Sequence, residues 1–228
     1  MVVYVQQFSL LGQADGKTKH RLEHQAGLSL LKAGLAREYQ IIVSDMEKEI
    51  TPGFKGKPFL HNNPEIFFNI SHGGAMAACG LDRNPLGVDV EEIRPVKPAI
   101  WKRVLTGEER LYLERYSLKK QDREFFRIWT LKESYAKAIG LGLALDFTSL
   151  SCHLVSEEES ARGDLKENIR QIPGKRFREG LDNSEEHFWM DEVSVERTQN
   201  EGDCPWHFFQ TVLEERFVIS CCCRLPFL

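Results

Sequence analysis

The sequence predicts a fold of the α+β class, with separate helices and strands packed around a hydrophobic core. Apolar residues recur at the helical period in two long stretches, residues 18–39 and 122–139. Short segments rich in β-branched residues, bounded by Gly and Pro, are typical of strands. With 228 residues, the chain is long enough for one large domain or two small ones. Its ordinary composition excludes a collagen, a coiled-coil rod and a wholly disordered chain.

The expected elements follow one another in a mixed order. Strands are expected at residues 2–8, 66–70, 75–81, 87–91, 147–155, 187–196 and 206–223, and helices at residues 18–39, 99–105 and 122–139. Residues 51–58 and 71–74 are rich in turn formers, and the charged stretch 156–186 is interpreted as a long loop. Thr106 followed by Glu109 has the capping-box pattern and predicts a helix start.

Charge and cysteine content restrict the class of partner and the compartment. Thirty basic and 34 acidic residues give a net charge of −4, so no large basic surface for nucleic acid is expected. No apolar run approaches the roughly 20 residues that cross a bilayer, and the first residues lack the features of a signal peptide. The six cysteines are interpreted as small apolar core residues of a cytoplasmic protein, in preference to a redox or metal role.

Asp89 and Glu91 form the first candidate site. Residues two apart on a strand share a face, so Val88 and Val90 should point to the core and both carboxylates away from it. Paired carboxylates on one face suit a hard cation. Taken alone, the pattern is more typical of the polar side of a half-buried strand.

Glu133 and Lys137 form the second candidate site. They lie four residues apart, so they share a face of the expected helix 122–139. The alternative is a surface ion pair without functional meaning, and the residues alone favour neither interpretation.

The third candidate site contains the polar residues near a Gly-Gly turn. Asn69, Ser71 and His72 end an expected strand, where a histidine and exposed backbone N–H groups can bind an anion. Taken alone, these residue types are more typical of an ordinary turn without a ligand. Lys55 and Lys57 lie in a Gly/Pro loop, where they would either bind phosphates or be solvated. His20 and His24 have the spacing of a metal-binding pair, but without a nearby third ligand a solvated helix face is the better interpretation.

Together these motifs resemble a known family. The segments Phe68-Asn-Ile-Ser-His72, Gly87-Val-Asp-Val-Glu91 and Trp129-Thr-Leu-Lys-Glu-Ser-Tyr-Ala-Lys137 are similar to signatures of the 4′-phosphopantetheinyl transferase superfamily. Gly56-Lys57-Pro58 also fits. The resemblance is to the Sfp-like (surfactin-synthetase-activating) branch and covers about residues 52–150.

The resemblance implies an activity. A transferase of this kind moves 4′-phosphopantetheine from coenzyme A to a serine hydroxyl of an apo acyl or peptidyl carrier protein, requires Mg²⁺ and releases 3′,5′-ADP. It implies a monomer. The charge, cysteine content and lack of a long apolar run lead us to expect a cytoplasmic protein that binds neither nucleic acid nor membranes. The carrier could belong to fatty-acid, polyketide or nonribosomal-peptide synthesis. A coenzyme A hydrolase and a binding module without catalysis are the competing hypotheses.

The resemblance also implies residue roles. Asp89, Glu91 and Glu133 match the metal-binding carboxylates, while Glu133 and Lys137 are the candidate catalytic residues. The residues expected to bind coenzyme A are Lys55, Lys57, Asn69, Ser71, His72, Asp89 and Lys137. Glu109 matches a further acidic position near the site, whereas Glu23 stands roughly where an arginine is common in the family.

The resemblance implies two similar α+β halves in a pseudo-twofold arrangement, with the active site in the cleft between them. The N-terminal half would comprise residues 1–86 and supply nucleotide contacts. The C-terminal half, residues 87–228, would supply the metal carboxylates and the catalytic helix. Carriers of this kind are typically acidic, so residues 118–123, Lys102 and Arg103 are a candidate docking surface, with Leu111, Leu113 and Tyr116 as apolar contacts. A solvated basic loop is the alternative.

Overall fold

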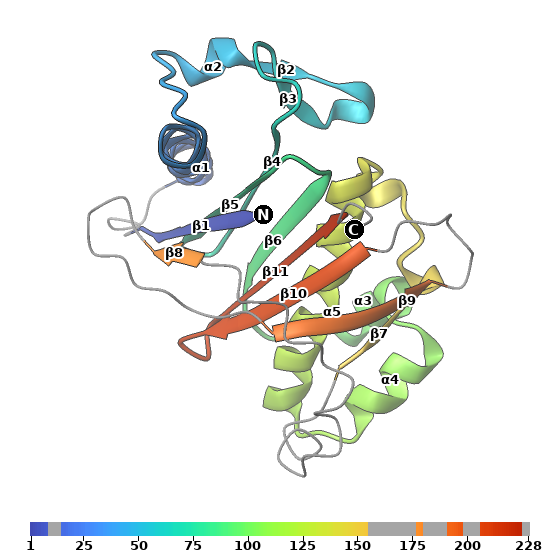
Figure 1. Ribbon diagram of the computed structural model, residues 1–228. Coiled ribbons are helices and arrows are strands. Elements are labelled where there is room, and N and C mark those ends of the chain that lie inside the picture. Colours follow the sequence, from blue (N-terminus) through green and yellow to red (C-terminus); the bar gives the residue numbers. More distant parts are fainter. Residues whose placement is uncertain (9–14, 155–176, 180–190, 198–205, 225–228) are drawn as a thin grey trace.

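The computed structural model describes residues 1–8, 15–154, 177–179, 191–197 and 206–224. These residues form two β-sheets, each packed against a long helix (Figure 1). The first sheet has the order β4-β5-β1-β8 and consists of β1 (Val2–Gln7), β4 (Phe67–Gly73), β5 (Met76–Asp82) and β8 (Phe177–Glu179). The second has the order β6-β11-β10-β9-β7 and consists of β6 (Leu86–Glu92), β7 (Leu150–His153), β9 (Asp191–Arg197), β10 (Trp206–Leu213) and β11 (Phe217–Arg224). The expected mixture of helices and sheets is confirmed.

Two long helices and several short ones accompany the sheets. The two long helices are α1 (Gly16–Tyr39) and α5 (Leu118–Ile139). Shorter elements are α2 (Met46–Glu49), α3 (Pro98–Val104), α4 (Gly107–Glu114), and the 3₁₀ turns η1 (Phe54–Gly56), η2 (Gly142–Ala144) and η3 (Phe147–Ser149). A small hairpin pairs β2 (Ile50–Pro52) with β3 (Pro58–Leu60). No helix in the described ranges is both long and apolar enough to cross a membrane.

Strand alternation divides the core into three layers. On β1, Tyr4 packs in the cluster beneath α1, whereas its neighbours Val3 and Val5 face the second sheet. On β11, Ile219 faces the first sheet and Val218 packs in the cluster beneath α5. The two sheets therefore share a central apolar layer, and a helix covers the outer face of each.

Several expected boundaries are wrong. Ser71 and His72 belong to β4 and not to the turn, because β4 continues to Gly73 and pairs with β5 throughout. The loop at residues 51–58 contains the β2–β3 hairpin, and residues 206–223 fold back as β10 and β11 around Glu214 and Glu215. Residues 147–149 form η3 before β7 begins. Of the expected loop at residues 156–186, the structure describes only residues 177–179, which form β8; the other residues lie outside the described ranges.

The packing role of the cysteines is confirmed wherever the structure describes them. Cys79, Cys152, Cys221, Cys222 and Cys223 are all buried and free of disulfides. Burial raises the pKa of the Cys79, Cys152 and Cys222 thiols, because a thiolate would lose its hydration. These thiols therefore behave as small apolar side chains.

Candidate active site

Strand β6 places two carboxylates at the junction of the two sheets. As predicted, Val88 and Val90 pack into the central layer, and Asp89 and Glu91 share the opposite face. Asp89 is only 4% exposed, so its face is not the ordinary solvated side of a strand. Burial raises the pKa of Glu91, an effect that the Arg94 guanidinium partly offsets by donating to Glu91 Oε2 at 2.8 Å.

Helix α5 reaches this strand because Gly87 has no side chain. A Cβ atom at Gly87 would collide with the carbonyl oxygen of Ser134 and lie 2.6 Å from the backbone nitrogen of Ala138. The backbones of β6 and α5 are thus in direct contact. Glu133 and Lys137, each one residue before those contact points, are consequently brought to the β6 carboxylates.

Glu133 is electrostatically coupled to the β6 carboxylates. Burial, together with the negative charges of Asp89 and Glu91, raises the pKa of Glu133 to about 7, although the Lys137 ammonium opposes the shift. A carboxyl group with such a pKa can hold or release a proton near neutral pH, as a general base must. Sequence spacing placed Glu133 and Lys137 on one helix face but gave no information on this coupling.

Lys137 joins three elements through one ammonium group. Its Nζ donates to Asp89 Oδ1 at 2.6 Å and to Ser71 Oγ at 2.8 Å. Ser71 Oγ in turn donates to Asp89 Oδ1 at 2.9 Å. Strands β4 and β6 and helix α5 therefore converge on one Asp–Lys–Ser cluster.

The carboxylates of Asp89, Glu91 and Glu133 are suitable ligands for a hard cation, but they are not arranged as a preformed metal site. Asp89 Oδ2 is buried and has no hydrogen-bond partner among the described residues. A buried carboxylate oxygen without a partner, on an aspartate whose charge also acts on Glu91 and Glu133, is the kind of oxygen ligand that Mg²⁺ favours. Within the described part of the chain, however, no three acidic, histidine or cysteine side chains already converge as a metal-binding group. In this structure the Lys137 ammonium compensates part of the negative charge of Asp89.

His72 lies beside a second polar cluster. Its Nδ1 is 3.4 Å from Glu23 Oε2 on α1, and its ring centroid is 6.0 Å from that of His20. Burial lowers the pKa of His72; Lys137 and His20 lower it further, and Glu23 opposes them. His20 and His24 are exposed, as a solvated helix face predicts. Glu23, in contrast, is buried, with Lys19 Nζ 3.7 Å from its Oε1.

The other residues predicted to bind coenzyme A make different contacts. Lys57 Nζ donates to the carbonyl oxygens of Leu86 and Ala138 at 2.9 and 2.6 Å. Burial lowers the pKa of Lys57 to about 8. Asn69 is buried and accepts a hydrogen bond from the backbone of β6. Lys55 lies in η1 with a left-handed backbone and is exposed.

Glu109 lies in a separate polar cluster. It closes the predicted capping box with Thr106 and accepts a hydrogen bond from Lys132 Nζ at 2.6 Å. Lys132 is fully buried and also donates to the carbonyl oxygens of Val104 and Phe147. The structure thus places Glu109 in a buried ion pair with Lys132, and its expected position near the carboxylate site stays a prediction.

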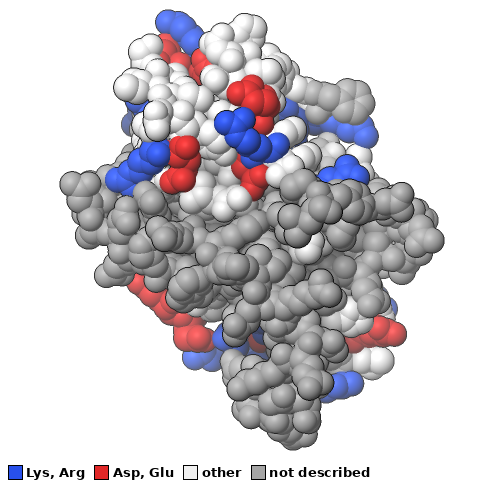
Figure 2. Space-filling model, viewed as in Figure 1, with Lys and Arg blue, Asp and Glu red and all other residues white. Residues whose placement is uncertain are grey.

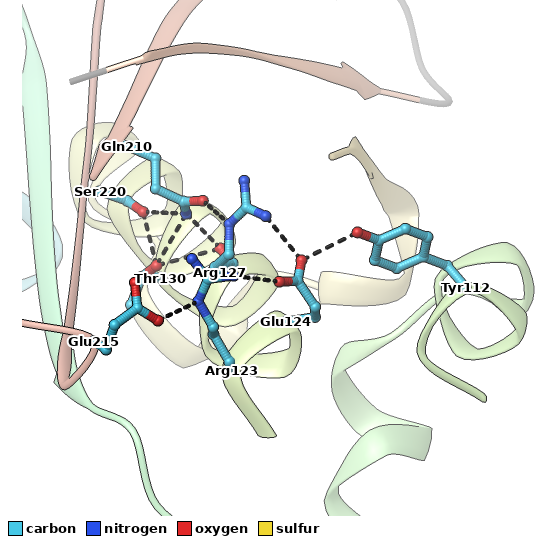
Figure 3. A network of polar contacts seen from close by, with 8 residues as sticks. All are labelled: Tyr112, Arg123, Glu124, Arg127, Thr130, Gln210, Glu215 and Ser220. Carbon is cyan, nitrogen blue, oxygen red and sulfur yellow. Dashed lines mark hydrogen bonds and ion pairs between the residues drawn. The ribbon is translucent and has the colours of Figure 1, made fainter. Parts of the chain in front are cut away.

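A further network anchors the first half of α5 to the second sheet (Figure 3). Arg127 Nε donates to Gln210 Oε1 at 2.8 Å, and Gln210 Nε2 donates to Ser220 Oγ at 2.8 Å. Thr130 and Ser220 share a hydrogen bond of 2.7 Å. The helix is therefore fixed to β10 and β11 within two turns before Glu133.

The surface agrees with the mixed charge of the sequence. On the face shown in Figure 2, the described Lys and Arg side chains are interspersed with Asp and Glu. No large patch of one sign is visible among the described residues there.

The fold and the site define an α+β protein with a carboxylate–lysine cluster where its two sheets meet. Residues 85–171 match the family model described as the 4′-phosphopantetheinyl transferase superfamily. The resemblance seen in the sequence motifs is thus confirmed: part of this chain is similar to the Sfp-like 4′-phosphopantetheinyl transferases.

Several curated proteins are similar to this chain over part of their length. The 4′-phosphopantetheinyl transferase Sfp of Bacillus subtilis is 34% identical over 125 residues, which cover 55% of each chain. The transferase gsp of Aneurinibacillus migulanus is 35% identical over 53% of this chain and 52% of that protein. The matches thus span about half the length of these relatives. A solved holo-(acyl-carrier-protein) synthase from Bacillus anthracis has a TM-score of 0.40 at 14% identity, covering 61% of this chain and 94% of that one.

Proposed function

We propose that this protein transfers 4′-phosphopantetheine from coenzyme A to a serine hydroxyl of an apo acyl or peptidyl carrier protein and releases 3′,5′-ADP. One observation carries the proposal: Asp89, Glu133 and Lys137 meet at the contact of β6 with α5, within the segment that matches the transferase family. The activity named for the curated relatives supports it.

Asp89, Glu91 and Glu133 are the residues that would hold Mg²⁺. The bound ion would lower the repulsion between the serine oxygen and the pyrophosphate and stabilise the leaving phosphate. The buried Asp89 Oδ2 has no partner among the described residues, so it offers a free oxygen for this purpose. The charge of Asp89 also holds Lys137 in place through the 2.6 Å hydrogen bond.

Glu133 would accept the proton of the attacking serine, directly or through a water molecule. Its pKa of about 7 matches the requirement of a base that works near neutral pH. Lys137 would donate a hydrogen bond to a phosphate oxygen as negative charge develops there. His72 and Lys55 supply further positive or hydrogen-bonding groups for the anionic nucleotide part of coenzyme A.

Mass spectrometry with coenzyme A, Mg²⁺ and an apo carrier domain tests the proposal. The carrier should gain one phosphopantetheine group, and 3′,5′-ADP should appear in equal amount. A hydrolase would produce 3′,5′-ADP without any carrier, and a binding module would leave both substrates unchanged. Either of those results would replace the proposed function.

A further inference from the structure

Strands β4 and β6 lie at facing edges of two different sheets. β4 pairs only with β5, and β6 pairs only with β11, in the sheet orders that the described strands form. Every second residue of a strand presents its N–H and C=O groups to the same edge. The edge of β6 opposite β11 therefore carries backbone groups that need partners.

Three side chains of the N-terminal part of the chain supply those partners. Lys57 Nζ donates to Leu86 O at 2.9 Å, Asn69 Oδ1 accepts from Val88 N at 2.8 Å, and Ser71 Oγ accepts from Val90 N at 3.3 Å. The β6 residues bound are 86, 88 and 90, at the spacing of one strand edge. Side chains thus take the place of a neighbouring strand.

The packing around this edge leaves little freedom. A Cβ atom at Gly73 would collide with the carbonyl oxygen of Val90 and lie 2.9 Å from the Cα atom of Glu91. Lys57 additionally donates to Ala138 O, so the same lysine fixes the end of α5. β4, β6 and α5 are consequently held together immediately around Asp89.

We propose that Lys57, Asn69 and Ser71 are positioning residues, which hold the edge of β6 and thereby set the places of Asp89 and Glu91. The resemblance alone implies direct contacts with coenzyme A for all three. Their polar atoms are instead engaged by β6, and Asp89 and Glu91 alternate with the residues they bind. This proposal rests on the proposed function only for the role of Asp89 and Glu91, the residues that are positioned.

Asn69 gives the sharpest test, because its contact with Val88 is separate from the carboxylates. Asn69→Leu keeps the side-chain size and removes the acceptor, whereas Asn69→Asp retains it. In the full chain, amide hydrogen exchange at Val88 should become at least about tenfold faster in Asn69→Leu and return towards the wild-type rate in Asn69→Asp. Asn63→Ala, in the turn before β4, is the matched control and should leave Val88 unchanged.

Two functional readouts separate positioning from ligand binding. Mn²⁺ alone, titrated by electron paramagnetic resonance without coenzyme A, should bind several-fold more weakly to Asn69→Leu. In transfer assays, kcat should fall with an unchanged KM for coenzyme A. Unchanged exchange at Val88 would overturn the proposal, as would a raised KM with a normal kcat, the sign of a direct ligand.

A second pair of variants keeps the test decisive if Asn69→Leu does not fold. Ser71→Ala should accelerate exchange at Val90, and Ser71→Thr should restore protection. Exposed Ser117 makes no capping hydrogen bond, so Ser117→Ala is a matched control. Exchange and Mn²⁺ binding require no carrier, so they remain informative even if the wild-type protein transfers nothing.

Discussion

The Lys137 ammonium on α5 donates a 2.6 Å hydrogen bond to Asp89 Oδ1 on β6. This pair connects residues 48 positions apart and leaves the second oxygen of Asp89 buried without a partner among the described residues. Asp89 is thereby oriented and partly neutralised on one side, while its other side remains able to accept a cation. The first prediction follows from this arrangement.

Replacing Asp89 by Asn should abolish transfer while the fold persists. The variant keeps the shape of the side chain but loses the charge that would bind Mg²⁺ and hold Lys137. We expect a loss of roughly a hundredfold or more in rate, which corresponds to about 3 kcal/mol or more of barrier. Carrier mass spectrometry and circular dichroism measure the two effects. Asp45→Asn, at an exposed helix cap, is the control, and near-normal turnover of folded Asp89→Asn would refute the assignment.

The raised pKa of Glu133 predicts a pH dependence of activity. Only the deprotonated carboxylate can accept the serine proton, so kcat/KM should fall as pH decreases through about 7. Bound Mg²⁺ would favour the carboxylate and move this limb to lower pH. The acidic limb should disappear from the residual activity of Glu133→Gln. A pH–rate profile that is the same in both proteins would exclude Glu133 as the titrating base.

The same pKa shift predicts a pH dependence of stability. Because the folded-state pKa of about 7 lies above the ordinary glutamate value of 4.5, the native protein binds more protons than the unfolded chain between these values. The contribution of Glu133 to the free energy of unfolding should therefore decrease as pH rises from about 4.5 to 7. Urea unfolding without metal measures it. Glu133→Gln should have a flatter stability profile than the wild type in this window.

The contact of Gly87 with α5 predicts that this residue tolerates no side chain. In Gly87→Ala, the new Cβ would meet backbone atoms of Ser134 and Ala138, so the helix must shift. Such overpacking typically costs about 1–3 kcal/mol of the free energy of unfolding. Transfer should also slow, because Glu133 and Lys137 move with α5. Gly107→Ala is the matched control, since a Cβ there would meet nothing within 4 Å; equal stability of the two variants would contradict the prediction.

Breaking the buried pair of Lys132 and Glu109 should destabilise the protein strongly. Lys132→Met leaves the Glu109 carboxylate buried without its cation, and removing one partner of a buried ion pair typically costs about 3–5 kcal/mol. Chemical denaturation measures the loss. Lys48→Met removes an exposed partner of Asp45 and should cost less than about 1 kcal/mol. A small effect of Lys132→Met would show that Glu109 has another way to compensate its charge.

The candidate carrier-docking surface keeps two of its expected leucines and loses the third. Leu118 and Leu111 are 80% and 61% exposed, whereas Leu113 is fully buried and cannot contact a partner. Lys120 Nζ lies 4.5 Å from the centre of the Tyr116 ring, so a positive charge and an apolar surface are adjacent there.

Reversing Lys119 and Lys120 to Glu should raise the KM for an acidic carrier without changing that for coenzyme A. The effect should shrink at high salt, because exposed charges are screened beyond a Debye length of about 8 Å at physiological ionic strength. Steady-state kinetics at two salt concentrations measure it. Lys48→Glu, on exposed α2, is the control. An unchanged carrier KM at low salt would place docking elsewhere.

Local periodicity in the sequence was sufficient to predict much of the fold. The spacing of two assigned Asp89 and Glu91 to one face of a strand, and the spacing of four assigned Glu133 and Lys137 to one face of a helix. The capping box at Thr106 was equally visible, because it depends on contacts within one turn. The family resemblance was confirmed, whereas the roles of the individual site residues stay predictions.

Only the tertiary structure decided which of these residues meet. Lys57 was expected in a loop, and Asn69 and Ser71 near a turn, all three as contacts of coenzyme A. In the folded chain their polar atoms form hydrogen bonds with the edge of β6. The resemblance implied only an acidic position near the site for Glu109, and the structure supplies its partner, Lys132. Sequence periodicity fixes the face on which a side chain lies, because it follows from the geometry of a single element. The partner across that face depends on packing between distant elements, such as the backbone contact that Gly87 permits, and so it emerges only when the chain is folded.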